Sequence, residues 1–196
     1  WSHVVSLLYA QLTHSLSLND ICDSLENHSG ALKEIRGATA PRRNTLSHAN
    51  KNRNADMAEE LFWSVLNSLQ KTYPQFGIGS QYSAFPRRFK KAIYAVDSTT
   101  IKLVANCLNW AKHRQRKAAA KCHMQLNLQS FLPNFALVKT ANTHDSTEAK
   151  ELCANISSGE IVVFDKAYVD YKHLYHLSSR GIFWVTRAKG NMAYTV

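Results

Sequence analysis

Two aspartates follow apolar runs, and their chemistry gives the first indication of function. Asp97 follows residues 92–96 and Asp165 follows residues 161–164; both runs are short, apolar and contain β-branched side chains. Such runs are typical of strands buried on both faces of a sheet. Two such strands lying side by side would hold both carboxylates at one edge of a core. Paired carboxylates suit a hard divalent cation such as Mg²⁺, so we expect a metal site there.

Each of these positions also has a simpler interpretation. Taken alone, Asp97 fits a turn residue at a strand end, and Asp165 fits the cap of a following helix. Asp145 fits the N-terminal cap of a helix over residues 146–156, and His123 fits a structural role. The metal interpretation is preferred because a single fold explains these positions together.

The elements that would position the aspartates follow from the hydrophobic pattern after residue 91. The segment 101–104 is either a second strand or a continuation of the first. The pattern predicts the remaining elements as strands at 92–97, 122–128, 135–138, 161–165 and 182–186, and helices at 146–156 and 170–179. This order predicts an α/β fold with a mixed sheet and flanking helices.

The first 80 residues have a different pattern, which is helical throughout. Apolar residues at helical spacing predict helices at 1–13, 17–27 and 55–72, with Ser17 capping the second, and shorter helical segments are expected at 31–35 and from about 44. The helix from about 44 is almost entirely polar and basic, and with helix 17–27 it suggests a helix-turn-helix with a long connection. A basic connector at 80–91 marks the expected domain boundary.

The charge balance points to a polyanion partner. The chain has 196 residues, with 24 Lys and Arg against 14 Asp and Glu, giving a formal net charge of +10. A basic soluble protein is the simpler interpretation, and nucleic acid is the commonest partner for the other. The candidate DNA contacts, each also compatible with an ordinary solvated helix or loop, are Arg42, Arg43, Lys51, Arg53, Lys112, Arg114, Lys117 and Lys121.

The remaining composition argues against several classes of protein. The four cysteines contain no Cys-x-x-Cys pair, so reduced thiols are expected rather than a zinc site. No apolar run approaches the ~18 residues of a membrane span, and no signal peptide is evident, so no membrane partner is expected.

Several short motifs, in order and spacing, resemble a known family. They are Asp97-Ser98-Thr99-Thr100-Ile101, Asn109-Trp110-Ala111, Lys121-Cys122-His123, Thr143-His144-Asp145-Ser146, Phe164-Asp165-Lys166-Ala167-Tyr168 and Val185-Thr186-Arg187-Ala188-Lys189. Together with the helical region before them, they resemble a DDE transposase of the IS4 family. The resemblance covers nearly the whole chain. The predicted strand order is likewise that of a ribonuclease-H-like fold, in which the two Asp-bearing strands are neighbours.

The resemblance implies a function. It implies a ribonuclease-H-like DDE catalytic domain over residues 92–196, preceded by a helical, DNA-binding region over residues 1–80. Family members cut and rejoin double-stranded DNA at terminal inverted repeats and in target DNA, using Mg²⁺, with Mn²⁺ as an alternative. Asp97 matches the first metal ligand and Asp165 the second. A homodimer on DNA, in the bacterial cytoplasm at the nucleoid, is compatible with the resemblance.

Two departures from the family pattern affect the expected activity. The family usually has Arg-Gly after the second Asp, where this chain has Lys166-Ala167. The family's third carboxylate, a Glu in a Tyr-x-x-Arg-x-x-x-Glu helix, has no match here, so we expect a C-terminally truncated chain that is inactive alone. Two alternatives are a non-catalytic DNA-binding remnant that acts as a repressor or inhibitor, and another ribonuclease-H-like nuclease.

Overall fold

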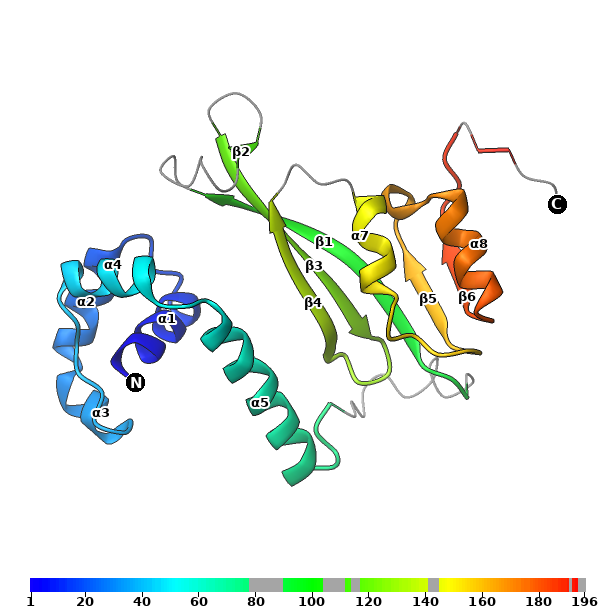
Figure 1. The fold of residues 1–196 in the computed structure, drawn as a ribbon. Helices are drawn as coiled ribbons and strands as arrows, with labels where there is room; N and C mark the ends of the chain where they lie inside the picture. Colours follow the sequence, from blue (N-terminus) through cyan, green and yellow to red (C-terminus); the bar gives the residue numbers. More distant parts are fainter. Residues whose placement is uncertain (78–89, 104–111, 114–116, 141–144, 191, 194–196) are drawn as a thin grey trace. The chain divides into compact units, whose positions relative to one another are not determined.

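The chain divides into two compact units, which are described separately (Figure 1). The computed structural model describes residues 1–77, 90–103, 112–113, 117–140, 145–190 and 192–193. The first unit is Trp1–Asn67 and the second is Ser68–Val196.

The first unit is helical, as the sequence predicts. Its helices are α1 (Ser2–Leu12), α2 (Leu18–Asn27), α3 (Ser29–Glu34), α4 (Arg43–Asn52) and the first part of α5 (Asp56–Thr72). The predicted cap at Ser17 is present, because its Oγ accepts a hydrogen bond from the Asp20 amide at 3.2 Å. The core of the unit consists of Ile21, Cys22, Leu25, Leu32 and Leu46.

Helices α4 and α5 differ in how their apolar residues are used. Leu46 is the buried residue of α4, and the rest of that helix is polar, as predicted. Helix α5 forms where its apolar stripe predicts it, but none of its residues is buried. Phe62 and Val65 of that stripe are 46% and 48% exposed. The stripe was sufficient to predict a helix, although its residues are only partly covered or exposed.

The second unit contains the sheet that carries both aspartates. Its strands are β1 (Ile93–Leu103), β2 (Lys112–His113), β3 (Lys117–Asn127), β4 (Pro133–Thr140), β5 (Ile161–Phe164) and β6 (Phe183–Thr186). The strands other than β2 lie in the order β4-β3-β1-β5-β6. Strand β2 pairs with the start of β3. The pairs β1–β3 and β3–β4 are antiparallel, whereas β1–β5 and β5–β6 are parallel. This is the ribonuclease-H-like mixed sheet that the sequence predicts.

Three strands are longer than the sequence indicates, and one of them, β4, covers Pro133–Thr140 rather than residues 135–138. Residues 101–103 continue β1, which decides between the two alternatives left open for that segment. Strand β3 begins at Lys117 rather than at residue 122, so part of the expected basic loop is a strand. Ala119 and Ala120 are each 3% exposed, and their small side chains fit the paired sheet.

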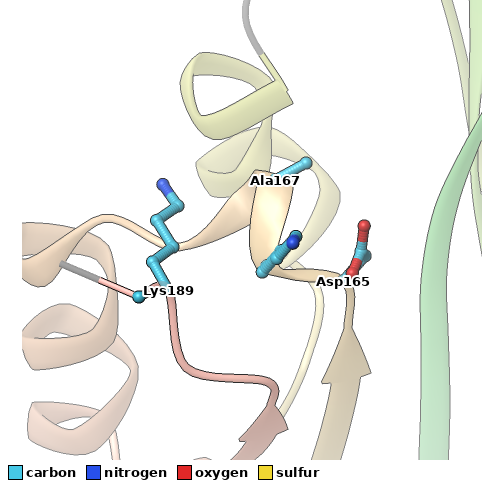
Figure 2. Close-up of a pocket in the computed structure, with 5 residues that line it drawn as sticks. Asp165, Ala167 and Lys189 are labelled. Carbon is cyan, nitrogen blue, oxygen red and sulfur yellow. The ribbon is translucent and has the colours of Figure 1, made fainter. Parts of the chain in front are cut away.

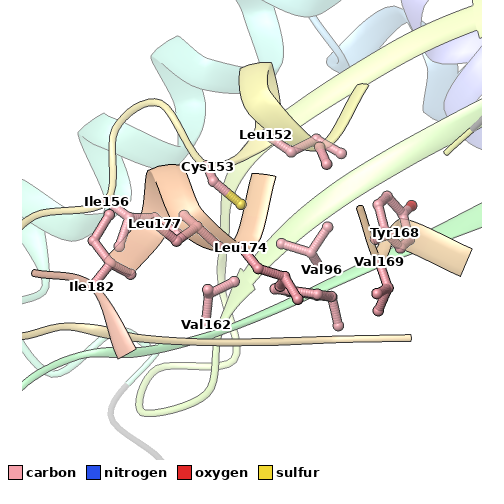
Figure 3. Packing of buried hydrophobic residues seen from close by; sticks show 12 residues of the cluster. Val96, Leu152, Cys153, Ile156, Val162, Tyr168, Val169, Leu174, Leu177 and Ile182 are labelled. Carbon is pink, nitrogen blue, oxygen red and sulfur yellow. The ribbon is translucent and has the colours of Figure 1, made fainter. Parts of the chain in front are cut away.

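The core of the second unit lies between one face of the sheet and two helices (Figure 3). Helices α7 (Asp145–Leu152) and α8 (Tyr171–Ser179) follow β4 and β5, and a short 3₁₀ turn, η4 (Lys166–Tyr168), follows Asp165. Helix α7 ends before the predicted Ile156, although Ile156 is still buried. The central contacts come from Val96, Leu152, Cys153, Val162, Phe164, Tyr168, Leu174 and Leu177.

Candidate metal and DNA site

The strand register brings Asp97 and Asp165 next to each other. Val96 on β1 pairs with Phe164 on β5, and each aspartate is the next residue along its strand direction. Asp165 keeps an extended backbone, with φ −70° and ψ 158°, so the alternation of sides continues through it. Neighbouring strands lie about 4.8 Å apart, and this register with the alternation of sides places both aspartates on the same face of the sheet, on adjacent strands.

The sequence predicts Asp97 at the end of its strand, but in the structure Asp97 lies inside β1. Strand β1 continues to Leu103, but β5 pairs with it only as far as Val96. Asp97 is therefore the first residue of β1 beyond the segment that pairs with β5, although it still pairs with Met124 of β3, and its side chain is exposed. Its Oδ1 lies 2.7 Å from the amide of Ser98, which donates to it.

Asp165 already has a cationic partner. Arg187 Nη2 lies 2.9 Å from Asp165 Oδ1, and the side chains are 77% and 43% exposed. The hydrogen bond from Arg187 is the largest cause that lowers the pKa of Asp165, followed by a backbone hydrogen bond from Lys166. Asp165 precedes η4 but makes no capping hydrogen bond through its side chain. Asp165 is therefore the N-cap residue of this turn by position, but its side chain does not make the capping hydrogen bond.

A pocket of about 320 Å³ opens beside Asp165 (Figure 2). It is lined by Asp165, Lys166, Ala167, Lys189 and Gly190. Lys189 Nζ donates to the carbonyl of Val169 at 2.7 Å, which fixes its stem along one wall. The pocket is thus lined by one acidic and two basic residues, a setting that suits an anionic ligand beside a metal ion.

A buried polar network anchors the turn that follows Asp165. His123 on β3 is fully buried, and its Nδ1 lies 2.9 Å from the hydroxyl of Tyr168 in η4. The same ring nitrogen is 3.9 Å from Asp145 Oδ1, which accepts from Lys121 Nζ at 2.8 Å. Burial raises the pKa of Tyr168 to about 12, so its hydroxyl stays protonated at neutral pH.

Sequence reasoning missed this network. It placed Asp145 as a cap and gave His123 a structural role, but it assigned nothing to Tyr168. Strand alternation could have placed Lys121 and His123 on one face of β3. The contact with Tyr168 depends on how η4 folds back, and no sequence pattern indicates that.

The donor set fits a divalent cation in part. Asp97 and Asp165 supply anionic oxygens on one exposed face, which is the chemistry that Mg²⁺ and Mn²⁺ prefer. No group of three or more His, Cys, Asp and Glu side chains able to hold a metal ion occurs in the described ranges. The free thiols Cys22 and Cys153 are buried and Cys122 is partly buried; Cys107 lies outside those ranges.

Four of the basic DNA-binding candidates belong to α4 and its flanks. Arg42, Arg43, Lys51 and Arg53 are all exposed. Arg43 makes one long contact, 3.5 Å, to the side-chain oxygen of Asn44. Within the described part of the chain none of the four is in an ion pair, so their charges are open to an external anion.

The other four candidates are distributed differently. Lys112 lies on β2 and Lys117 at the start of β3, and Arg114 lies outside the described residues. Lys121 is paired with Asp145, and its side chain is only 19% exposed. Its charge is matched inside the domain, so it is a weaker candidate for a DNA contact than the four around α4.

The strand order and the strand directions define a class of fold, the ribonuclease-H-like mixed sheet. The sequence model of the family described as "Transposase DDE domain" matches residues 88–196, a little over half of the chain. The chain therefore belongs to the DDE transposase family. This confirms the resemblance to DDE transposases, whereas the IS4 assignment stays a prediction.

One relative has a similar sequence. The chain is 29% identical over 105 residues to the probable transposase for insertion sequence element IS5377 of Geobacillus stearothermophilus. The match covers 54% of this chain and 27% of that protein. The chain thus spans about a quarter of the length of this relative.

Two solved structures have distant similarity. One is a chain of the simian T-cell lymphotropic virus intasome in complex with PP2A regulatory subunit B56 gamma, at 20% identity and TM-score 0.33, covering 48% of this chain and 31% of that chain. The other is the piggyBac transposase synaptic complex with hairpin DNA, at 11% identity and TM-score 0.47, covering 97% and 41%. The fold assignment rests instead on the strand order. None of the helices in the described ranges has the length and apolar character that crossing a bilayer requires.

Proposed function

We propose that this chain is the aspartate-bearing part of an IS4-family transposase that cleaves and joins DNA at the terminal inverted repeats of an insertion sequence. Asp97 and Asp165 are the proposed catalytic residues and metal ligands. The observation that carries the proposal is the register of Val96 with Phe164, which supports a shared site for the two carboxylates that follow. The family of the chain supports the reaction class.

The proposed chemistry needs few protein groups. Bound Mg²⁺, or Mn²⁺, would activate a water or 3′-hydroxyl for attack and neutralise the leaving oxygen. Asp97 and Asp165 would hold the metal, and the β1–β5 pairing would fix their separation. No covalent bond to the protein is required. Two carboxylates compensate less charge than three, so we expect this chain to bind metal weakly.

We further propose that the two parts of the chain have different roles. Residues 1–80 would bind double-stranded DNA of the inverted repeats through the cations around α4, and residues 92–196 would act on the repeat ends and on target DNA. A homodimer on DNA would bring two ends together. Binding to the bacterial chromosome would concentrate the protein at the nucleoid in the cytoplasm.

A second candidate function is a non-catalytic DNA-binding protein that occupies the repeats as a repressor or inhibitor. One observation favours it: the described ranges offer no third metal ligand near the aspartate pair. Metal binding separates the two candidates, because a repressor has no need of it.

The test is a Mn²⁺ titration of the chain, followed by electron paramagnetic resonance, with Asp97→Asn and Asp165→Asn. Loss of one anionic ligand should weaken Mn²⁺ binding on the order of tenfold or more. Duplex DNA affinity in the absence of metal should not fall, because the carboxylates do not take part in docking. Asp170→Asn is the matched control, since asparagine caps α8 as well as aspartate does.

The outcomes are distinct. Equal Mn²⁺ binding by the wild type and both site variants would exclude the shared site. Loss in Asp170→Asn as well would show that the effect comes from net charge rather than from ligation.

A further inference from the structure

Three residues form a row across three neighbouring strands. Val96, Phe164 and Thr186 are in register on β1, β5 and β6, and the residues that follow them are Asp97, Asp165 and Arg187. Two proposed metal ligands and one cation are therefore adjacent at the same edge of the sheet. Arg187 reaches back to the middle carboxylate, Asp165, at 2.9 Å.

The ion pair between Arg187 and Asp165 is of the kind that can be exchanged for contacts with other ions. Arg187 is 77% exposed, and within the described residues Asp165 is its one hydrogen-bonding partner. Exposed ion pairs of this type contribute little to stability, because water competes for both charges. Arg187 can therefore leave Asp165 without cost to the core, which lies on the other face of the sheet.

The same carboxylate oxygen cannot serve two cations equally well. Asp165 Oδ1 accepts from Arg187, and a metal ion held by Asp97 and Asp165 would need oxygen lone pairs of the same group. The guanidinium and the metal are therefore competitors for Asp165. Each binds more weakly when the other is present.

The surroundings offer the released guanidinium a second partner. Lys166 and Lys189 both line the pocket beside Asp165, so a phosphate placed there would lie near two lysine residues. A guanidinium binds phosphate through two parallel hydrogen bonds, which suits Arg187 better than a lysine for this position.

We propose that Arg187 is an exchangeable counter-ion: it holds Asp165 in the metal-free chain and binds a DNA backbone phosphate, beside Lys166 and Lys189, when Asp165 holds a metal ion. The inference rests on the proposed function, because it requires the metal site at Asp97 and Asp165. It adds a coupling between metal and DNA through this chain's own side chains. Metal binding should raise the affinity of the chain for DNA, and DNA binding should raise its affinity for metal by the same factor.

The first arm of the test measures metal alone. Arg187→Gln keeps a polar side chain with an N–H donor, although a shorter one, and removes the charge. Without DNA it should bind Mn²⁺ more tightly than the wild type, by about two- to fivefold, since an exposed competitor has been removed. Arg187→Lys should lie between the two. Lys172→Gln, an exposed cation on α8, is the charge-matched control and should change nothing.

The second arm measures a short DNA duplex with and without Mn²⁺. Without metal, Arg187→Gln and wild type should bind equally, because Arg187 is engaged with Asp165. With Mn²⁺, Arg187→Gln should bind more weakly and lower the slope of log K against log salt by about one. A general electrostatic role would instead weaken binding in both conditions. Thermal unfolding of each variant checks that the fold is intact.

The failures can be told apart. Unchanged or weaker Mn²⁺ binding by Arg187→Gln overturns the exchange, while a loss of Mn²⁺ binding in Asp165→Asn keeps the metal site. If wild type and Asp165→Asn bind Mn²⁺ equally, the metal site is wrong and this inference falls with it. A DNA defect that does not depend on metal also overturns the exchange.

Discussion

A histidine with no access to solvent links the three parts of the fold nearest to the aspartates. His123 on β3 meets Tyr168 in η4 and lies 3.9 Å from Asp145 of α7, and its Nε2 has no hydrogen-bond partner in the described ranges. Burial is the largest cause that lowers its pKa. The charged groups that face it are Lys121, Lys139, Asp145 and Glu148.

This histidine should make stability depend on pH. The lowered pKa means that the unfolded chain takes up a proton near the ordinary value of 6.5, whereas folded His123 stays neutral to lower pH. The contribution of neutral His123 to the free energy of unfolding is therefore fully present above pH 6.5 and is lost as the pH falls below it. The slope of this loss approaches about 1.4 kcal/mol per pH unit. Urea unfolding between about pH 5 and pH 7.5 should show this, and His123→Gln should flatten the slope.

Two further variants test this pH dependence of stability. Burial lowers the pKa of His173 too, so part of the slope should survive in His123→Gln and disappear only when His173 is also replaced. His48→Gln, at an exposed position on α4, is the control. An unchanged slope in His123→Gln would mean that the buried imidazole protonates within the fold.

At the scale of elements, the end of α8 fixes how β6 enters the sheet. Gly181 has φ +69°, its amide donates to Ser178, and the amide of Ile182 donates to Leu177. This pair of hydrogen bonds is the Schellman motif, and the buried Leu177 and Ile182 supply its apolar contact. Arg180, beside the glycine, donates to the carbonyls of Cys153, Ala154 and Ile156, which secures the chain after α7.

Gly181→Ala should therefore destabilise the second unit. The left-handed backbone disfavours a Cβ, and a Cβ built there would lie 2.5 Å from Ser158 Oγ. We expect a loss of about 1–3 kcal/mol in the free energy of unfolding, measured by denaturant titration. The matched control is Gly30→Ala in α3, where nothing lies within 4 Å of the added Cβ. A loss of the same size in both variants would contradict the argument.

The sequence predicted most elements because their apolar patterns are strong and local. The runs before Asp97 and Asp165 and the cap at the start of α2 are of this kind. The early start of β3 was missed because Lys117 to Lys121 carries alanines and lysines, and only pairing with β1 makes it a strand. The stripe of α5 predicted the helix correctly but could not reveal that none of its residues is buried.

The site was predictable to the same extent. Two aspartates after buried strands could be recognised from composition and order, and the register agrees with their being neighbours. Arg187 was not found, because its relation to Asp165 depends on the alignment of β5 with β6. Lys121 appeared as one of several free cations, because sequence gives no sign that Asp145 would be opposite it.

At the scale of the whole molecule, the two units differ in whether their cations are paired with acidic side chains. The second unit pairs several of its cations internally, as in Lys121 with Asp145 and Arg187 with Asp165. The cations around α4 have no such acidic partners in the described part of the first unit. A net charge of +10 therefore leaves a local excess where an external polyanion can neutralise it.

That excess leads to the last prediction, which concerns salt. Replacing Arg42, Arg43 and Lys51 together by Ala should weaken duplex DNA binding and lower the slope of log K against log salt by roughly 0.9 for each phosphate that the protein no longer neutralises. The control triple replaces Lys33, Lys71 and Lys172, three exposed lysines on other helices, and so removes the same charge elsewhere. Fluorescence anisotropy over a range of salt concentrations gives both slopes. If the cations around α4 bind phosphate, the slope of the first triple falls well below that of the control; equal slopes would mean that net charge alone attracts DNA, and salt-independent binding by the wild type would contradict the phosphate contacts altogether.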